Sequence, residues 1–307
     1  MPDLLPVLLL GGPTASGKSS LAIRIAQELN GVIINADSMQ LYDALATLTA
    51  QPDPAECAKA PHRLYAVLDP ADKTDAVKWR DMAVQEIRQA EADDRLPIIV
   101  GGTGFYIETL TAGLSPIPEV SPDTRNRGEA LLAEQGLENF YQNLLAADPH
   151  VDGLIDAQNP RRVMRAWEVF ETTGKSLAYW QQQPKSGPPA GLRFIKAALL
   201  PPRADIYTRC DRRFDTMLDS GAVDEVRALQ AQIDAGTVPE QALITKAIGF
   251  REISSWLKGE ISKDAAADAA RQATRNYAKR QTTWLRNRYG AEVVFNDAGD
   301  PLDCLPL

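Results

Sequence analysis

The sequence predicts an α/β fold, in which a P-loop-containing parallel sheet is flanked by helices and interrupted by an all-helical insertion domain. In the first third of the chain, short apolar runs alternate with segments of helical periodicity, which is typical of a parallel sheet. A glycine-rich loop follows the first apolar run. Residues 116–191 show helical patterns with no strand-like run between them. We therefore expect a core of residues 1–115 and 192–307 and an insertion of residues 116–191.

The first strand and helix of this core enclose a phosphate-binding motif. Residues 4–10 are apolar and predict a buried strand, and residues 20–30 repeat apolar side chains at helical spacing. The loop between them matches G-x-x-x-x-G-K-[ST], whose main chain and lysine hold phosphates and whose hydroxyl residue can hold Mg²⁺. The expected diphosphate-binding residues are Gly12, Pro13, Thr14, Ala15, Ser16, Gly17, Lys18 and Ser19, with Ser19 as the metal ligand.

The next two strands, residues 31–35 and 96–100, also end in polar residues. Ligands of such sheets bind beyond the carboxyl ends of the strands. Asp37 follows the first of these strands and can hold Mg²⁺, act as a general base or cap the next turn. A glycine turn that contains Thr103 follows the strand of residues 96–100. P-loop kinases and nucleotide-hydrolysing proteins usually carry an Asp at this strand end, so the glycine turn disfavours a kinase.

The rest of the chain is mostly helical. Three prolines in residues 114–122 predict a linker, and residues 123–180 are helical in pattern. Residues 194–200 predict a strand that returns to the sheet. Residues 203–289 are again helical, and residues 291–295 can form a last strand. Arginines near the start of the latter helical part can clamp a diphosphate; they are Arg203, Arg209 and Arg213.

Composition and charge narrow the function. The chain has 307 residues and a net charge of −8. Its three cysteines lack CxxC spacing and it has two histidines, which indicates neither a disulfide framework nor a zinc site. No apolar run approaches the roughly 20 residues of a membrane span, so a cytoplasmic protein is expected. Residues 271–288 nevertheless hold six basic residues, aromatic residues and no acid, and a second basic cluster occupies residues 161–165. Both clusters favour a polyanionic partner.

These motifs together resemble the tRNA dimethylallyltransferases, also called tRNA isopentenyltransferases. The P-loop, residues 35–42, residues 100–106, residues 159–165, residues 247–251 and residues 277–286 carry the resemblance, in family order and over nearly the whole chain. The segment 43–52 departs from the family because it lacks the basic residues often found there. His62 stands where the family often has a histidine pair, and no role is expected for it.

The resemblance implies transfer of a dimethylallyl group from dimethylallyl diphosphate, with Mg²⁺, to N6 of the adenosine 3′-adjacent to the anticodon. The tRNAs would be those that read codons starting with U, diphosphate would be released, and the enzyme is expected to be a monomer. Asp37 would be the general base, Thr103 would contact the substrate at the reacting centre, and Lys18 with an arginine, first of all Arg209, would neutralise the diphosphate. The tRNA anticodon stem-loop is expected to contact Asp37, Ser38, Met39, Gln40, Thr103, Arg125, Arg161, Arg162, Val163, Met164, Arg165, Lys246, Arg251, Lys279, Arg280 and Arg286.

Three other functions remain open at this point. An isopentenyltransferase acting on free AMP, ADP or ATP would share the P-loop but would not need the two basic clusters. A P-loop kinase of small molecules is disfavoured by the glycine turn after the third strand. A nucleotide-dependent RNA-binding module without chemistry is disfavoured by the pairing of Asp37 with Thr103.

Overall fold

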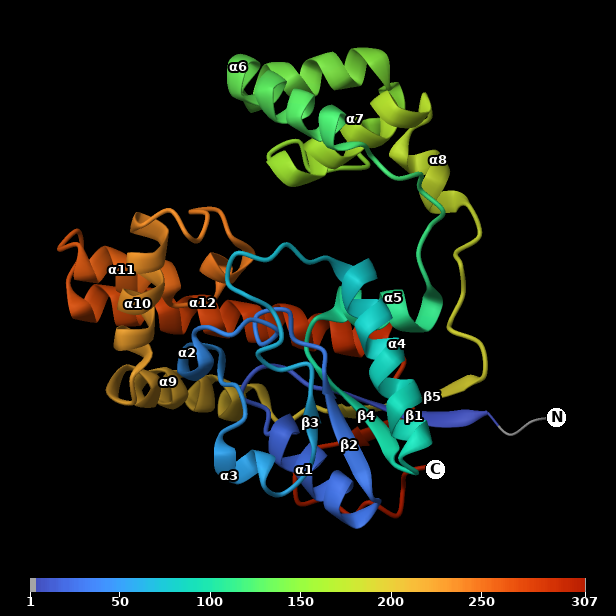
Figure 1. Ribbon diagram of the computed structural model, residues 1–307, viewed down its shortest axis with the longest axis vertical. Coiled ribbons are helices and arrows are strands. Elements are labelled where there is room, and N and C mark those ends of the chain that lie inside the picture. The colour runs from blue at the N-terminus through green and yellow to red at the C-terminus, as the bar shows by residue number, and fades with distance from the viewer. Residues whose placement is uncertain (1–3, 307) are drawn as a thin grey trace. The chain divides into compact units, whose positions relative to one another are not determined.

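One parallel sheet organises the larger part of the molecule. The computed structural model describes residues 4–306, and within them six strands hydrogen-bond in the order β3-β2-β4-β1-β5-β6 (Figure 1). The strands are β1 (Leu5–Gly11), β2 (Gly31–Asn35), β3 (His62–Arg63), β4 (Leu96–Gly101), β5 (Leu192–Leu199) and β6 (Val293–Phe295). The predicted α/β class is confirmed. The two-residue strand β3 was not predicted, because it has no apolar run of its own.

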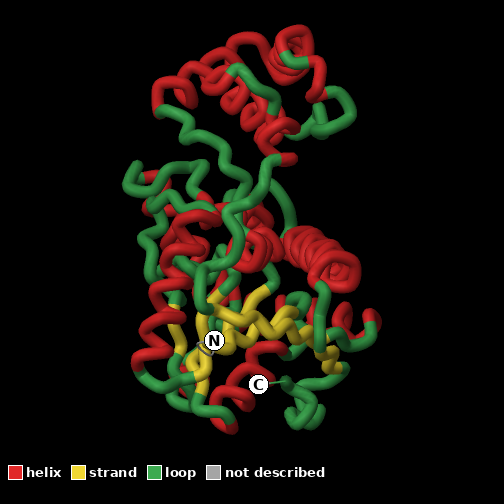
Figure 2. Tube along the Cα trace, turned by 90° about the vertical axis from the view of Figure 1, so that its right-hand side faces the viewer, coloured by secondary structure: helices red, strands yellow, loops and turns green. Residues whose placement is uncertain are grey.

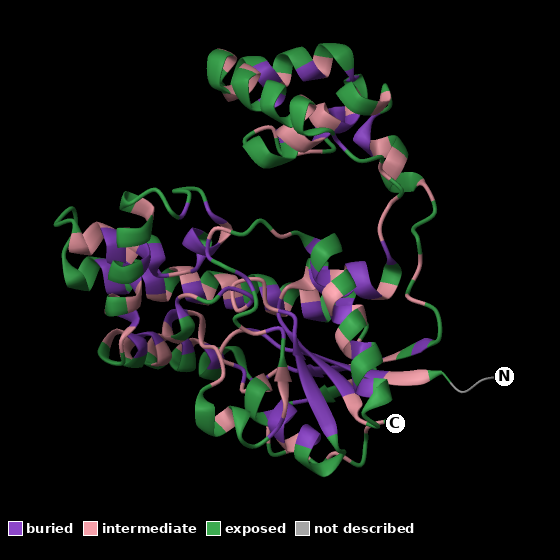
Figure 3. Ribbon diagram, in the orientation of Figure 1, coloured by how far each residue is buried: buried purple, intermediate pink, exposed green. Residues whose placement is uncertain are grey.

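The sheet is buried on both faces because alternate side chains of each strand point to opposite sides. On one face Leu8 and Leu10 pack with α1 (Lys18–Glu28). On the other, Leu9 packs in a larger core that includes Trp79 of α4 (Ala76–Ala92) and residues of α5 (Gly104–Ala112). Figure 3 shows the central strands in the colour of buried residues, and Figure 2 shows the strands in yellow among the red helices.

Two short helices follow β2, namely α2 (Ala46–Thr49) and α3 (Pro54–Cys57). The helices that follow β5 complete this unit and are α9 (Arg203–Asp219), α10 (Ala222–Asp234), η2 (Leu243–Lys246), α11 (Phe250–Leu257), α12 (Lys263–Trp284) and the π-helical turn η3 (Leu285–Tyr289). Helices α9 and α12 pack along each other. This packing places two helices against the carboxyl ends of the strands, which is where the site forms.

A second compact unit comprises Ala112–Pro188, between the two parts of the first unit, Met1–Thr111 and Pro189–Leu307. Its helices are α6 (Pro122–Ala147), η1 (Pro149–Val151), α7 (Pro160–Thr173) and α8 (Leu177–Gln182), and its described residues contain no strand. Helix α6 is interrupted at Gly136, whose φ of 73° favours glycine. The unit has a core of its own around Phe140, Leu144 and Val163. Among the helices of residues 4–306, none is long and apolar enough to cross a membrane.

Candidate active site

The P-loop wraps around the space beyond β1. Gly17 takes a φ of 95° directly before α1, and the Ser16 amide donates to the Pro13 carbonyl at 3.2 Å. A Cβ on Gly12 would lie 2.7 Å from Ser16 Oγ, so only glycine lets the loop close this tightly. The Ser16 hydroxyl is buried and has no hydrogen-bond partner among the described residues. The main-chain amides at the start of α1 are therefore presented to an anion, as the motif predicts.

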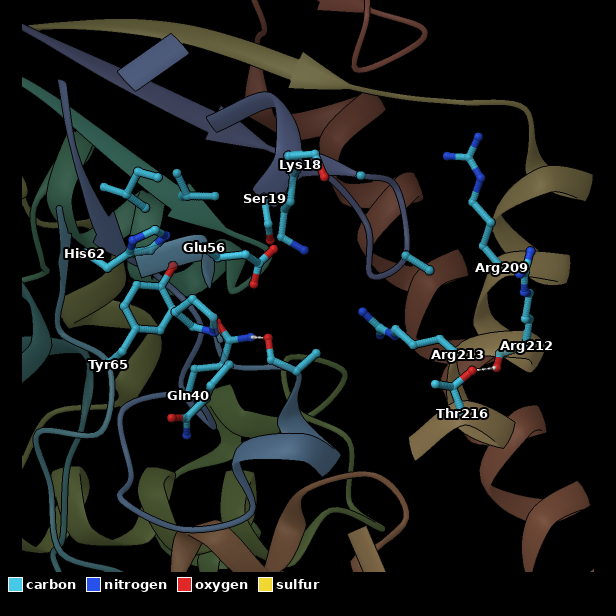
Figure 4. A pocket seen from close by; sticks show the side chains of 18 residues that line it. Lys18, Ser19, Gln40, Glu56, His62, Tyr65, Arg209, Arg212, Arg213 and Thr216 are labelled. Carbon is cyan, nitrogen blue, oxygen red and sulfur yellow. Dashed lines mark hydrogen bonds between the residues drawn. The ribbon is translucent and has the colours of Figure 1, made fainter. Parts of the chain in front are cut away.

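A cavity of about 490 Å³ opens in front of this loop (Figure 4). Lys18 and Arg213 point into it from α1 and α9, and Arg209 of α9 also lines it (Figure 4). The opposite wall comes from the segment after β2 and from β3, and it carries Gln40, Glu56, His62 and Tyr65. The cavity thus joins cations on one side to hydrogen-bonding groups on the other.

Two partly desolvated cations dominate the electrostatics of this cavity. Burial lowers the pKa of the Lys18 ammonium from 10.5 to about 8, although the Asp37 carboxylate opposes the shift. Burial also lowers the pKa of the Arg213 guanidinium, which remains charged. The Arg213 charge lowers the pKa of Lys18 further by like-charge repulsion. A bound polyanion would relieve both the desolvation and the repulsion.

Arg213, rather than Arg209 or Arg203, is the arginine that faces Lys18. The Arg213 guanidinium donates to the Thr14 hydroxyl of the P-loop. Arg209 also lines the large cavity and donates to the Ser16 carbonyl at 3.2 Å, so it contacts the main chain of the loop. Arg203 is exposed and donates to the Tyr207 hydroxyl at 2.9 Å. Arg209, the first choice from sequence, and Arg213 thus both line the large cavity, whereas Arg203 does not.

The sheet order brings Asp37 and Thr103 together. Strand β2 lies beside β4, and the Ser38 amide donates to Thr103 Oγ1 at 3.3 Å. Asp37 accepts from the Met39 amide through one carboxylate oxygen at 3.0 Å, so it caps its own turn and keeps its other oxygen for a ligand. A Cβ on Gly101 would lie 2.3 Å from the Ala36 carbonyl oxygen. The glycine turn is therefore needed for this close approach.

A neighbouring cavity of about 290 Å³ contains Asp37, and part of its wall is apolar. Arg213 lines this cavity and the larger one, so it stands where the two meet. The apolar wall consists of Met39, Leu48, Phe214, Met217 and Ile248. Tyr277 and Arg280 of α12 and Lys246 of η2 also line it. Together the cavities can accommodate a ligand with an anionic end and an apolar end.

The basic stripe predicted on residues 271–288 is divided by the packing of α12. Arg271 and Arg275 form ion pairs with Asp215 and Asp211 of α9, at 2.5 and 2.6 Å, and are therefore not free for a polyanion. Lys279 is exposed instead. A groove of about 490 Å³ runs over this side of the helix and is lined by Asn276, Lys279, Arg280, Thr283, Trp284, Asn287 and Arg288. Arg286 is also exposed, as is Arg251 on α11.

The predicted RNA-contacting residues of the second unit differ in their exposure. Arg125, Arg161 and Arg162 are exposed. Met164 and Arg165 are half-buried, and Arg165 lies 3.4 Å from Glu168. Val163 is 0% exposed in the core of this unit, so its side chain is not available to RNA.

Several groups at the site were not predicted. Glu56 and His62 line the large cavity, and neither has a signal in its neighbouring residues. Gln40 was predicted to contact tRNA, but its amide nitrogen donates to the carbonyls of Thr49 and Ala50 at 2.8 Å, so only its oxygen remains for a ligand. Among residues 4–306, no cluster of three or more His, Cys, Asp or Glu side chains could hold a metal ion.

Known proteins resemble this chain over nearly its whole length. The profile of a family described as IPP transferase matches residues 40–288. The tRNA dimethylallyltransferase of Rhodospirillum centenum is 45% identical over 99% of this chain and 95% of its own length. That of Paramagnetospirillum magneticum is 47% identical over 95% of this chain and 91% of its own length.

Solved structures give the same result. The full-length tRNA isopentenylpyrophosphate transferase of Bacillus halodurans superimposes with a TM-score of 0.68 and 30% identity, covering 98% of this chain and 92% of that one. A eukaryotic dimethylallyltransferase acting on tRNA superimposes with a TM-score of 0.82 and 26% identity, covering 96% of this chain and 74% of that one.

Proposed function

The chain belongs to the IPP transferase family, and on that premise we propose that dimethylallyl diphosphate is its donor and N6 of the adenosine 3′-adjacent to the anticodon is its acceptor. Prenylation of tRNA is the activity of the enzyme. The tRNAs would be those that read codons starting with U, and diphosphate would be the second product.

The observation that carries this proposal is the position of Arg213, which lines both the larger cavity in front of the P-loop and the smaller cavity that contains Asp37. A diphosphate in the larger cavity would face the P-loop amides, Lys18 and Arg213. The five-carbon group would then extend past Arg213 towards the apolar side chains and Asp37 of the smaller cavity. The bond between the allylic carbon and the diphosphate oxygen would thus lie beside a guanidinium, where leaving-group charge develops.

The reaction can be derived from these groups. The adenine N6 amine is a poor nucleophile because its lone pair is delocalised into the ring. As N6 attacks the allylic carbon, the C–O bond breaks and its electron pair leaves with the diphosphate. The free oxygen of Asp37 accepts the proton from N6. Lys18 and Arg213 stabilise the departing charge.

The cavity also fits Mg²⁺, which we propose as the cofactor. The Ser19 hydroxyl and the Glu56 carboxylate both point into the large cavity, and hydroxyl and carboxylate oxygens are ligands that Mg²⁺ accepts (Figure 4). Magnesium usually keeps several waters and binds through few protein groups together with phosphate oxygens. Ser19 would hold the ion, which would supply charge neutralisation at the diphosphate.

Exposed cations support tRNA rather than a free nucleotide as the acceptor. Lys279 lies on a groove and lines neither of the two cavities, so a mononucleotide bound in them would not reach it. The anticodon loop is single-stranded, so its adenosine can be turned out at low cost. One chain supplies the residues of both cavities, which supports our proposal that the enzyme acts as a monomer. We propose the cytoplasm, where tRNA is found, as its location.

A double-label assay tests the proposal. The protein is incubated with either ¹⁴C-labelled dimethylallyl diphosphate or γ-³²P-labelled ATP, and with unmodified tRNA or AMP. We expect ¹⁴C in tRNA alone, and none in a transcript with guanosine in place of the target adenosine. Transfer of ¹⁴C to AMP, or of ³²P to any acceptor, would show a different function.

A further inference from the structure

The inner face of α12 lies directly against the glycine turn that follows β4. A Cβ on Gly102 would be 2.0 Å from Gln281 Nε2, and one on Gly104 would be 2.6 Å from Trp284. Both distances are too short for any side chain. The absence of side chains in this turn therefore allows α12 to approach the reacting centre.

The Gln281 amide connects two loops of the site. Its oxygen accepts from the Thr14 amide of the P-loop at 2.8 Å, and its nitrogen donates to the Gly102 carbonyl at 3.2 Å. The side chain is 5% exposed. A carboxamide is the side-chain group that accepts on one atom and donates on the other without a charge. Gln281 is therefore matched to these two loops at once.

Tyr277, one helical turn earlier, extends this network to Thr103. Its hydroxyl lies close enough to the side chains of Thr103 and Gln281 for both to lower the pKa of the phenol, against the larger effect of burial. Burial raises the pKa of the Tyr277 phenol, so the hydroxyl keeps its proton and can donate. Tyr277 also lines the cavity that contains Asp37. The network thus runs from the P-loop through α12 to the side of the site where the acceptor would bind.

We propose that Gln281 is a positioning residue, which holds the P-loop and the Gly102–Thr103 turn at a set separation so that the prenyl carbon and adenine N6 meet. This inference rests on the function proposed above. Gln281 acts through Thr14 and Gly102, rather than on the reacting atoms. A misplacement of about 1 Å can reduce the rate by roughly 10²-fold, so two hydrogen bonds between the loops can have a large effect on turnover.

The first test replaces the amide without changing the length of the side chain. Gln281→Met should lower the single-turnover rate by about 10- to 100-fold, while the Kd for tRNA changes less than about threefold. Gln272→Met is the matched control, because Gln272 is an exposed residue of the same helix whose amide hydrogen-bonds to its helix neighbours Asn276 and Arg275. Its rate should stay within about twofold of the parent rate.

A second variant separates positioning from folding. Tyr277→Phe removes one hydroxyl and should lower the single-turnover rate by about three- to tenfold with an unchanged melting temperature. Circular dichroism of each variant reports whether it is folded. If Gln281→Met and Tyr277→Phe are folded and prenylate tRNA at the parent rate, the inference about Gln281 is wrong and the proposed function stands. If the parent transfers no prenyl group to tRNA, the proposed function itself is wrong.

A double-mutant cycle tests the contact itself. Gly102→Ala should reduce the rate at least about tenfold, because the new methyl group displaces the Gln281 amide. In a Gln281→Ala background, the nearest remaining atom is the Gly12 carbonyl oxygen at 3.3 Å, so the same change should cost less than about threefold. If the rate losses of Gly102→Ala and Gln281→Ala multiply in the double variant, the two positions act independently and the proposal is wrong.

Discussion

Binding of dimethylallyl diphosphate to the free enzyme should take up a proton at pH 9, because Lys18 must regain its charge. Burial places the pKa of the free Lys18 ammonium at about 8. About nine-tenths of the molecules therefore carry the charge at pH 7 and about one-tenth at pH 9. A diphosphate beside Lys18 favours the ammonium and returns its pKa towards the ordinary value of 10.5.

The expected magnitude follows from proton linkage. Full return of the Lys18 pKa to 10.5 predicts uptake of about 0.9 proton per ligand at pH 9 and about 0.1 at pH 7. The affinity should accordingly fall about tenfold between pH 7 and pH 9. The terminal phosphate of the ester loses its last proton near pH 6, so it contributes little at pH 9.

Calorimetry in two buffers of different ionisation enthalpy measures this uptake, without tRNA so that no reaction occurs. Lys18→Arg is the control, because a guanidinium keeps its proton throughout this pH range. The variant should bind with no proton uptake. The reasoning is refuted if the parent enzyme takes up less than about 0.2 proton at pH 9, or if Lys18→Arg takes up as much as the parent.

Three further predictions concern other parts of the site. Asp37→Ala should lower turnover by about 10²-fold or more while filter binding shows tRNA affinity retained, as expected of a general base; near-normal turnover would exclude that role. Arg213→Gln should lower kcat by about 10²- to 10³-fold, because it removes charge at the leaving group, and Arg209→Gln by less than tenfold; a reversed order in steady-state assays would restore the sequence-based choice. Lys279→Gln should reduce the slope of log Kd for tRNA against log salt by up to about one, whereas Arg275→Gln, whose charge is paired with Asp211, should leave the slope unchanged; equal effects would show that RNA competes for the pair.

Predictions from sequence succeeded where the signal lies in neighbouring residues. The P-loop is a contiguous motif between a buried strand and a helix, so its residues determine the local backbone and direct its amides towards an anion. The apolar runs likewise predicted the long strands of the sheet, because each is buried on both faces. The short strand β3 has no such run, so it was missed.

Tertiary packing decided which side chains face the site. A helical repeat of basic residues does not reveal that α9 presents Asp211 and Asp215 to Arg275 and Arg271, and so the basic stripe was predicted too long. The same holds for Val163, which the insertion core buries.

The sequence alone determined the fold class, the phosphate-binding loop and the presence of Asp37 and Thr103 at strand ends, because local spacing encodes each of them. Only the folded chain decided that Arg213 faces Lys18 and that Gln281 reaches the Thr14 amide, 267 positions away. A hydrogen bond depends on separation in space, and the packing of the whole core sets that separation.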